Sequence, residues 1–422
     1  MIEPTRPRPR ALARSLTLAG VALLGAALLL AGCGGGPPKA RIEEQQQQRE
    51  FASRGYAPQG EPVTMQPILW RIRGDDVRVS LTMPASMGAT AGTTPRPVVV
   101  YLPGLGESDT AGIRWRRAWA AAGYAVLSLQ ALDDDATAWS SELARSAEFT
   151  ELGRRHYADA QMRKRLARLD ELLAEAQRLG RQGQGQGDPP WRSLDWSKTV
   201  VAGYELGAQT AMAVAGERQS DGSVLALKTV QPVAAIVISP QVFASPDAAR
   251  YRDISIPVLG LTGPDDSDVL GLVRDVQWRQ APFAAMPAGR GWLLSANEVR
   301  HAALGGNEPR PEDTEREQKR IRAAEEQAQS QPQGRRGGGG RGGRGQEGPT
   351  RMAPVPAVPD YRQLHEQQLG MTAAQQVSVA FLDQQLKQSE AARAWLAGPV
   401  DTWLGALGSL RRSQDGARGH RH

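Results

Sequence analysis

Cysteine is almost missing from this 422-residue chain, because Cys33 is the only one, and there are only five histidines. A single thiol excludes intrachain disulfides, and no group of cysteine, histidine and carboxylate residues has the spacing of a metal site. We therefore expect neither a metal nor any other cofactor. Long apolar runs are also scarce: residues 17–31 form the only one that approaches the length of a membrane segment.

The chain also carries little excess basic charge outside its amino-terminal segment. The whole chain has a formal charge of +6, and removal of residues 1–32, with four arginines and one glutamate, lowers it to +3. Proteins that bind nucleic acids usually carry a stronger basic charge clustered on one surface. We therefore expect no nucleic-acid partner.

The amino terminus has the organisation of a secretory signal. Four arginines within residues 1–16 precede the apolar run, which ends in Leu30-Ala31-Gly32-Cys33. The run is too short and wrongly flanked for a spanning helix, and its end resembles a bacterial lipobox. The resemblance implies acylation of Cys33, attachment to a lipid bilayer and, with Gly34 next to it, an outer-membrane location facing the periplasm. The alternatives are a retained membrane helix and an ordinary buried thiol.

Composition divides the rest of the chain. Residues 34–62 contain Pro37-Pro38 and a glutamine run without apolar periodicity, which predicts a flexible tether. Residues 306–358 are charged and glutamine-rich, then rich in arginine and glycine, so their low apolar content predicts disorder. An exposed loop explains them better than an RNA-binding segment. We expect a signal peptide (1–32), a lipid-anchored tether (33–62), a core (63–305), a disordered insertion (306–358), carboxy-terminal helices of the same domain (359–410) and a tail (411–422).

Short β-branched runs alternate with helical patterns through the core. Residues 63–73 and 77–83, joined at Gly74-Asp75, predict an antiparallel hairpin. Alternation of strands with helices predicts an α/β fold, with a mostly parallel central sheet covered by helices on both faces. The further strands are expected at residues 97–102, 124–129, 199–202, 234–239, 256–262 and 291–294.

A long helical pattern precedes the fifth of these eight strands. Leucines at helical spacing occupy residues 140–179, and a Gly- and Pro-rich breaker follows at 183–190. This insertion is either a lid or an amphipathic surface helix. Asp133-Asp134-Asp135, just before it, is interpreted as a solvated loop or a helix cap. Apolar stripes in residues 371–410 predict closing helices that pack on the sheet.

The most informative motif is Gly203-Tyr204-Glu205-Leu206-Gly207. It follows an apolar strand and precedes a helical pattern of small residues, which is the spacing of a nucleophile elbow. Such a turn strains its central residue and crowds the residues two before and two after it, so Gly203 and Gly207 fit those places. The central residue is a glutamate where a serine is expected.

Other segments follow in the order that such a site requires. Residues 97–102 lead into Pro103-Gly104-Leu105-Gly106, and the amides of Leu105 and Leu206 are candidates for an oxyanion hole. Residues 256–262 lead into an acid-bearing loop, in which Asp266 is the candidate triad acid and Asp265 and Asp268 are rivals. Any of these carboxylates could instead cap a helix near Val269. His301 is the candidate base, with an ordinary surface histidine as the alternative.

These motifs resemble the α/β-hydrolase superfamily, in particular the branch of dienelactone hydrolases and platelet-activating-factor-acetylhydrolase-like esterases. The likeness covers about residues 60–305 and 371–410. It implies the α/β-hydrolase fold and the chain order of elbow, acid and histidine. Departures concern the chemistry: Pro103 and Tyr204 replace histidines of the family pattern, and Glu205 replaces the serine or cysteine nucleophile.

Glu205 decides what function the sequence predicts. A carboxylate that attacked an ester would form an anhydride and would leave more easily than the alkoxide, so ester hydrolysis by the usual route is disfavoured. We expect a silent binding or scaffold protein, with Glu205 accepting hydrogen bonds from the oxyanion amides or pairing with His301. One alternative is a hydrolase that acts on an ester or, like the dehalogenases and epoxide hydrolases that use aspartate, on an epoxide or alkyl halide. A small ester-like ligand is compatible with either. A different activity is the third hypothesis.

Overall fold

The computed structural model describes residues 39–56, 60–85, 95–182, 190–242, 247–308 and 361–413. The chain divides into a unit of Met1–Arg49 and a unit of Glu50–His422, and the second unit contains the whole sheet. The signal peptide, Cys33 and most of the insertion 306–358 lie outside the described residues.

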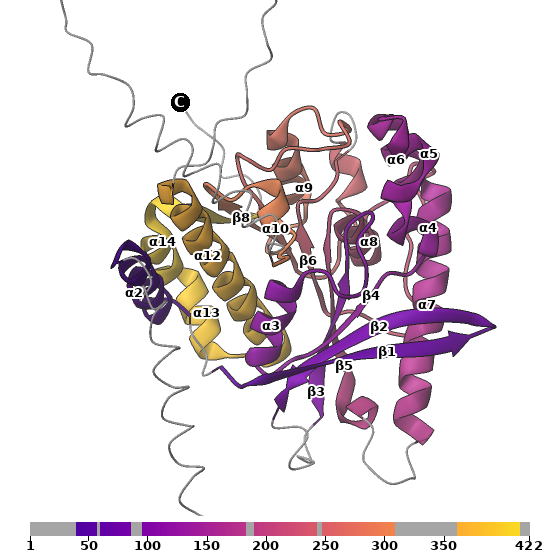
Figure 1. Cartoon of the computed structure of the whole chain (residues 1–422), viewed down its shortest axis with the longest axis horizontal. Helices are drawn as coiled ribbons and strands as arrows, with labels where there is room; N and C mark the ends of the chain where they lie inside the picture. Colours follow the sequence, from indigo (N-terminus) through magenta and orange to yellow (C-terminus); the bar gives the residue numbers. More distant parts are fainter. Residues whose placement is uncertain are drawn as a thin grey trace, which may run out of the picture. The chain divides into compact units, whose positions relative to one another are not determined.

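The centre of the second unit is a nine-stranded sheet with the order β1-β2-β4-β3-β5-β6-β7-β8-β9 (Figure 1). The six strands from β3 to β8 run parallel, and antiparallel strands flank them at both edges. This confirms the predicted α/β fold with a mostly parallel sheet. The strands are β1 (Val63–Ile72), β2 (Asp75–Pro84), β3 (Arg96–Leu102), β4 (Ala125–Leu129), β5 (Leu194–Tyr204), β6 (Ala234–Ile238), β7 (Val258–Thr262), β8 (Gly291–Ala296) and β9 (Gly408–Arg412).

Helices cover both faces of the sheet. Figure 1 shows α12 to α14 on one side and α7 on the other. The helices are α2 (Lys39–Arg54), α3 (Ile113–Ala121), α4 (Asp133–Ala136), α5 (Glu142–Arg145), α6 (Phe149–His156), α7 (Asp159–Gln182), α8 (Leu206–Ala215), α9 (Ala281–Ala285), α10 (His301–Leu304), α12 (Tyr361–Leu386), α13 (Glu390–Ala397) and α14 (Pro399–Leu404).

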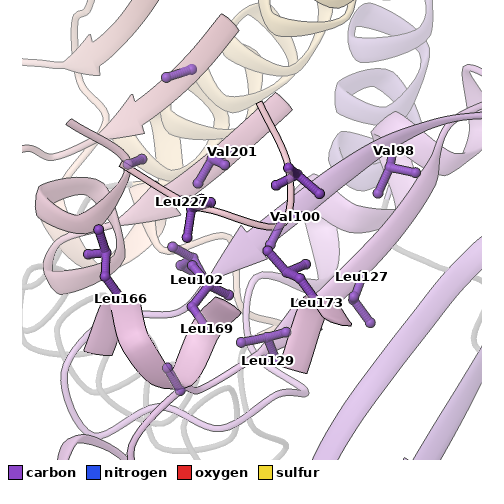
Figure 2. Close-up of a cluster of buried hydrophobic side chains, with 14 of the residues drawn as sticks. Val98, Val100, Leu102, Leu127, Leu129, Leu166, Leu169, Leu173, Val201 and Leu227 are labelled. Atoms are coloured by element: carbon purple, nitrogen blue, oxygen red, sulfur yellow. The ribbon is translucent and has the colours of Figure 1, made fainter. Parts of the chain in front are cut away.

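Successive side chains of each central strand point to opposite faces of the sheet, which produces two cores. Val98, Val100 and Leu102 of β3 point to the face that α7 and α8 cover, where they meet Leu166, Leu169 and Leu173 (Figure 2). Val99 and Tyr101 point to the other face, which α3 and α12 to α14 cover. Both faces are apolar because a parallel sheet buried on two sides has no solvated face. Leu166, Leu169, Leu172 and Leu173 of α7 therefore pack on the sheet, as the apolar face of an amphipathic helix does.

Four segments differ from the sequence prediction. The expected tether includes α2, whose Phe51 stacks on Trp403 of α14. The expected helical run of residues 140–179 is divided into α5, α6 and α7. Residues 306–308, assigned to the disordered insertion, make defined contacts, and β9 adds an edge strand across the boundary between the expected helices and tail. A polar segment such as 408–412 carries no hydrophobic alternation from which a strand could be predicted.

Candidate functional site

The predicted site residues follow the carboxyl ends of neighbouring parallel strands. The turn 103–106 follows β3, Glu205 follows β5, Asp266 follows β7 and His301 follows β8. Because parallel strands end at one edge of the sheet, these loops meet there. β3 and β5 are adjacent although β4 lies between them in sequence, so the crossover reverses direction at this point. Ligand sites of open α/β sheets are found at such a reversal.

Glu205 has the strained backbone of a tight strand-to-helix turn. Its φ of 46° and ψ of −105° lie in a region that non-glycine residues rarely adopt. A Cβ on Gly203 would overlap the backbone of Gly207, and one on Gly207 would overlap the carbonyl group of Leu102. Only glycine fits either position, which explains the spacing of the motif.

Glu205, His301 and Asp266 are in direct contact. His301 Nδ1 donates to Asp266 Oδ1 at 2.7 Å, and His301 Nε2 pairs with Glu205 Oε1. The exposed fraction is 0% for Asp266, 7% for His301 and 8% for Glu205, so water screens these contacts little. The structure thus brings together the three residues that the sequence analysis selected.

Neither rival acid contacts the imidazole. Asp265 offers only its backbone carbonyl, which accepts from the His301 amide at 3.2 Å. The Asp268 carboxylate accepts from the amides of Leu270, Leu272 and Val273, at 2.5 to 2.9 Å. It therefore organises its own loop.

Three further groups hold Asp266. The hydroxyls of Ser239 and Thr262 donate to its two carboxylate oxygens, each at 2.6 Å. Arg279, which is fully buried, lies 3.5 Å from Oδ2 and donates to the carbonyl groups of Asp266, Ser239 and Pro240. These donors fix the carboxylate and compensate its burial.

The two carboxylates keep the imidazole protonated. Burial alone would lower the pKa of His301, but the hydrogen bonds and charges of Asp266 and Glu205 outweigh it and raise the pKa to about 9. Burial would likewise raise the pKa of Asp266, but His301, Arg279 and Ser239 hold it below its usual value. At neutral pH, His301 is therefore an imidazolium between two carboxylates.

The second oxygen of Glu205 approaches the turn 103–106. A Cβ on Gly104 would lie 2.8 Å from Glu205 Oε2 and 3.2 Å from Glu107 Oε2, so both carboxylates approach one point beside Gly104. Glu205 makes no side-chain cap hydrogen bond to α8, although the first amides of that helix have no intrahelical acceptor. Of the two arrangements expected for Glu205, pairing with His301 is present, and no hydrogen bond from the amide of Leu105 or Leu206 to its carboxylate is found among the described residues.

Glu107 is a second carboxyl group beside the site. It accepts from the Gly104 amide at 2.8 Å and from Asn307 Nδ2 at 2.6 Å. Burial and, to a smaller extent, the charge of Glu205 raise its pKa to about 7, against the two hydrogen-bond donors and the charge of His301. Glu107 therefore changes its protonation state near neutral pH.

The predicted oxyanion residues lie beneath a separate segment. Leu105 and Leu206 are buried in a small apolar cluster with Ala138, Leu152 and Leu270. Trp139 Nε1 donates to the carbonyl group of Leu105 at 2.8 Å. Residues 136–155, which we call the cap, thus pack against the side chains of both predicted oxyanion residues.

Asp135 corrects one sequence interpretation. Asp133 and Asp134 are exposed, but Asp135 is fully buried rather than solvated. It accepts from His156 Nδ1 and from Arg165 Nε, each at 2.8 Å. We call these three residues the clamp. A run of three aspartates does not reveal that its third member has buried partners elsewhere in the chain.

Sequence analysis missed Ser239, Arg279, Glu107 and Asn307. Ser239 carried one usable signal, because it lies at the end of an apolar strand whose carboxyl end faces the site. Glu107 lies only two residues beyond Leu105 and could have been included with that turn. Arg279 and Asn307 belong to no motif, and only the fold brings them to the site.

No protein-family model matches the chain, and no curated protein matches it. Among the described residues, no group of three or more histidine, cysteine, aspartate or glutamate side chains could hold a metal ion. In the same ranges, no helix is both long and apolar enough to cross a membrane.

Proposed function

We propose that this protein is a catalytically silent member of the α/β-hydrolase superfamily, attached to the bacterial cell envelope and used for binding or as a scaffold. The observation that carries the proposal is the buried pair between Glu205 and His301. Support for the fold assignment comes from the strand order, the glycine-flanked strained turn, and the succession of Glu205, Asp266 and His301 along the chain.

The imidazole is in the wrong protonation state for a general base. In a serine hydrolase a neutral histidine takes the proton of the nucleophile. Here the pKa of His301 is about 9, so at pH 7 about one molecule in a hundred has a free imidazole. Glu205 also lacks the hydroxyl group that a serine would supply as the nucleophile. Both changes act against acyl transfer.

The Glu205 side chain also occupies the position that an ester substrate would take at a serine elbow. Its Cγ corresponds to a serine Oγ, and its carboxyl carbon corresponds to the acyl carbon of an ester on that oxygen. Oε1 then lies at the imidazole, and Oε2 approaches the oxyanion turn at Gly104. Glu205 thus resembles a permanent acyl group, which leaves no room for an ester carbonyl at the elbow.

Turnover by the purified mature protein tests the proposal. Short-chain aryl esters, epoxides and haloalkanes should show no hydrolysis above the rate of the buffer. Hydrolysis that both Glu205→Gln and His301→Ala abolish would overturn the silent assignment.

Restoration of the nucleophile is the complementary test. Glu205→Ser removes the side chain that resembles an acyl group. It also removes one of the two carboxylates that raise the pKa of His301, so we expect the variant to react with a fluorophosphonate. Glu205→Gln serves as the matched control, which should not react. A folded Glu205→Ser protein that remains unlabelled would show that the turn at Leu105 and Leu206 does not form an oxyanion hole.

The envelope location depends on Cys33, which lies outside the described residues. Acylation of its thiol would attach the mature chain to the outer membrane, facing the periplasm. We expect Cys33→Ala to move the protein from the detergent phase to the aqueous phase. Unchanged partitioning would exclude the lipid anchor.

A second candidate function is hydrolysis at an alkyl carbon. The strained backbone of Glu205 favours it, because strain of this kind persists mainly where function requires it. Attack by Glu205 on an alkyl halide would break the carbon–halogen bond, release halide and form an uncharged ester. Attack on an epoxide would break a ring C–O bond, and the alkoxide would take a proton from the His301 imidazolium. His301 would then lose one of its two carboxylate partners, its pKa would fall, and it could activate water to hydrolyse that ester.

A further inference from the structure

The sheet carries a groove at the end opposite to the site described above. It crosses the amino ends of the neighbouring strands β5, β6, β7 and β8 and has a volume of about 670 Å³. Its lining includes Trp196 near the start of β5, Val233 before β6, Pro257 before β7 and Arg290 before β8. From Thr199 to the elbow, β5 spans about 20 Å at the usual rise of a strand. The groove is therefore a separate place on the molecule.

A bulge in β5 carries Trp196 into this groove. Two successive residues of β3 pair with Asp195 and Thr199, so residues 196–198 are looped out of the ladder. The hydroxyl of Thr199 donates to the Trp196 carbonyl group at 2.8 Å and holds the loop in place. A bulge re-aims the side chains of a strand, and bulges are frequent beside functional sites.

The groove contains a cation without a partner. Among the described residues, no hydrogen bond or ion pair involves the exposed side chain of Arg290. In the same ranges, the indole N–H of Trp196, the hydroxyl of Ser255 and the side-chain amide of Gln231 also have no partner, and each of them lines the groove. All four groups can donate to an anion. No described aspartate or glutamate lines the groove, so its charge favours an anionic group.

Much of the remaining lining is apolar. Val233 is 36% exposed, and Ile256 and Pro257 are half-buried in the same groove. Neighbouring strands lie about 4.8 Å apart, so about 14 Å separate the backbone of Trp196 on β5 from that of Arg290 beside β8. A ligand that reaches both residues must be elongated, with an acidic group at one end and an apolar part at the other.

We propose that this groove binds an elongated amphipathic anion of the class of medium-chain carboxylates, with its acidic group paired to Arg290 and its apolar part against Trp196, Val233 and Ile256. The volume lies within the range of small-molecule sites, about 300–1,000 Å³. The inference goes beyond the proposed function and does not rest on it, since the groove and the elbow occupy opposite ends of the strands. Turnover at the elbow would overturn the silent assignment and leave the groove unaffected.

Calorimetric titration of the purified full chain tests the charge of the ligand. Decanoate, kept below its micelle concentration, should bind at least about tenfold more tightly than decyltrimethylammonium, which carries the opposite charge on a similar chain. Equal affinities would overturn the assignment of an anion. Phosphatidylglycerol vesicles present an acidic group on a bilayer, and binding to them without binding of decanoate would overturn a free ligand as the occupant.

Removal of the cation tests the role of Arg290. Arg290→Gln should weaken the binding of decanoate by about tenfold to a hundredfold, because a charge-assisted contact is lost. Arg274→Gln is the matched control: Arg274 is also exposed, but it lies in the segment after the carboxyl end of β7. It should leave the affinity unchanged. Equal affinities of the two variants would show that Arg290 does not bind the acidic group.

A pair of opposite charges at one position tests the location of the site. Val233→Glu and Val233→Lys both place a long polar side chain at an exposed residue, so both variants should fold. The glutamate variant should bind decanoate at least about tenfold more weakly than the lysine variant, because its carboxylate repels the anion. The same affinity in both variants would place the ligand elsewhere and overturn the proposal.

The carboxy-terminal tail is the competing occupant. Ser413 exchanges backbone hydrogen bonds with Gly289 and Gly291, on either side of Arg290, so residues 414–422 begin beside the groove. Removal of residues 414–422 should leave the affinity for decanoate unchanged. A tenfold gain in affinity would show that the tail occupies the groove, and would overturn a separate ligand as its partner.

Discussion

His301 lies between two carboxylates, and in the function we propose this arrangement separates the protein from a working hydrolase. In a Ser-His-Asp site the imidazole has one acidic partner and stays neutral until the nucleophile gives up its proton. Glu205 adds a second partner and so helps to raise the pKa of the ring to about 9, which keeps it protonated at neutral pH. If the proposed family assignment holds, one substitution at position 205 alters both the nucleophile and the base.

Titration of the imidazole is the direct measure of this effect. We expect the His301 ring signals in an NMR titration to move with a midpoint of about 9. In Glu205→Gln the midpoint should fall towards the ordinary histidine value, because one carboxylate partner is lost. A wild-type midpoint below 7 would contradict the argument for a silent site.

Gly104 is the residue whose missing side chain makes room for the Glu205 carboxylate. A methyl group there would lie 2.8 Å from Glu205 Oε2 and 2.9 Å from the Tyr204 ring. We expect Gly104→Ala to destabilise the fold by about 1–3 kcal/mol, the usual cost of overpacking. Chemical denaturation should show a smaller cost in a Glu205→Ala background. Gly60→Ala, whose only near contact is at 3.9 Å, should be close to neutral.

At the scale of elements, the sequence predicted the central strands and the closing helices well. Runs such as residues 97–102 and 256–262 are β-branched and apolar because both faces of the sheet are covered, so composition alone revealed them. β9 and α2 are polar and were missed. Their positions depend on distant partners, as when Phe51 stacks on Trp403.

The same limit applied to the site. Glu205, Asp266 and His301 follow strands in a fixed order, so their loops could be placed on one edge of the sheet. Arg279 acts from a segment with no motif, and Asn307 acts from a segment that composition assigned to disorder. Residues of this kind are found only when the fold brings distant segments together.

The clamp offers a test of how the cap is held to the rest of the protein. Asp135→Ala leaves Arg165 and His156 buried without their acceptor, and a broken buried ion pair costs about 3–5 kcal/mol. Asp134→Ala, one position earlier on the exposed side, should change the unfolding free energy by less than about 0.5 kcal/mol. Equal effects of the two variants in urea denaturation would show that Asp135 is solvated, as its sequence context suggested.

The stability of the whole molecule should decrease as the pH becomes alkaline. The pKa of His301 is about 9 in the fold and about 6.5 in the unfolded chain, so its contribution is complete below pH 6.5 and lost as the pH rises through 9. Glu107 and the buried Glu217 each have a pKa that is raised from 4.5 to about 7 in the fold. Because the fold favours their protonated form, the free energy of unfolding also decreases as the pH rises through this range.

We expect His301 alone to reduce the free energy of unfolding by about 2 kcal/mol between pH 7 and pH 10. Urea denaturation at intervals of one pH unit measures the slope. Glu205→Gln should be less stable than the wild type at pH 7 and should show a flatter profile between pH 8 and pH 10. Parallel profiles for the two proteins would contradict the coupling between Glu205 and His301.

The stacking of Phe51 on Trp403 concerns the second unit as a whole, because it brings a residue at the start of this unit next to α14, shortly before its last strand. When the beginning and the end of a folded unit are neighbours, the chain can be rejoined there by a short linker and opened elsewhere. A circular permutant of residues 50–413, opened at the exposed hairpin turn Arg73-Gly74, should therefore keep its fold. In such a permutant, the position of a membrane anchor could be moved along the sequence without altering the sheet.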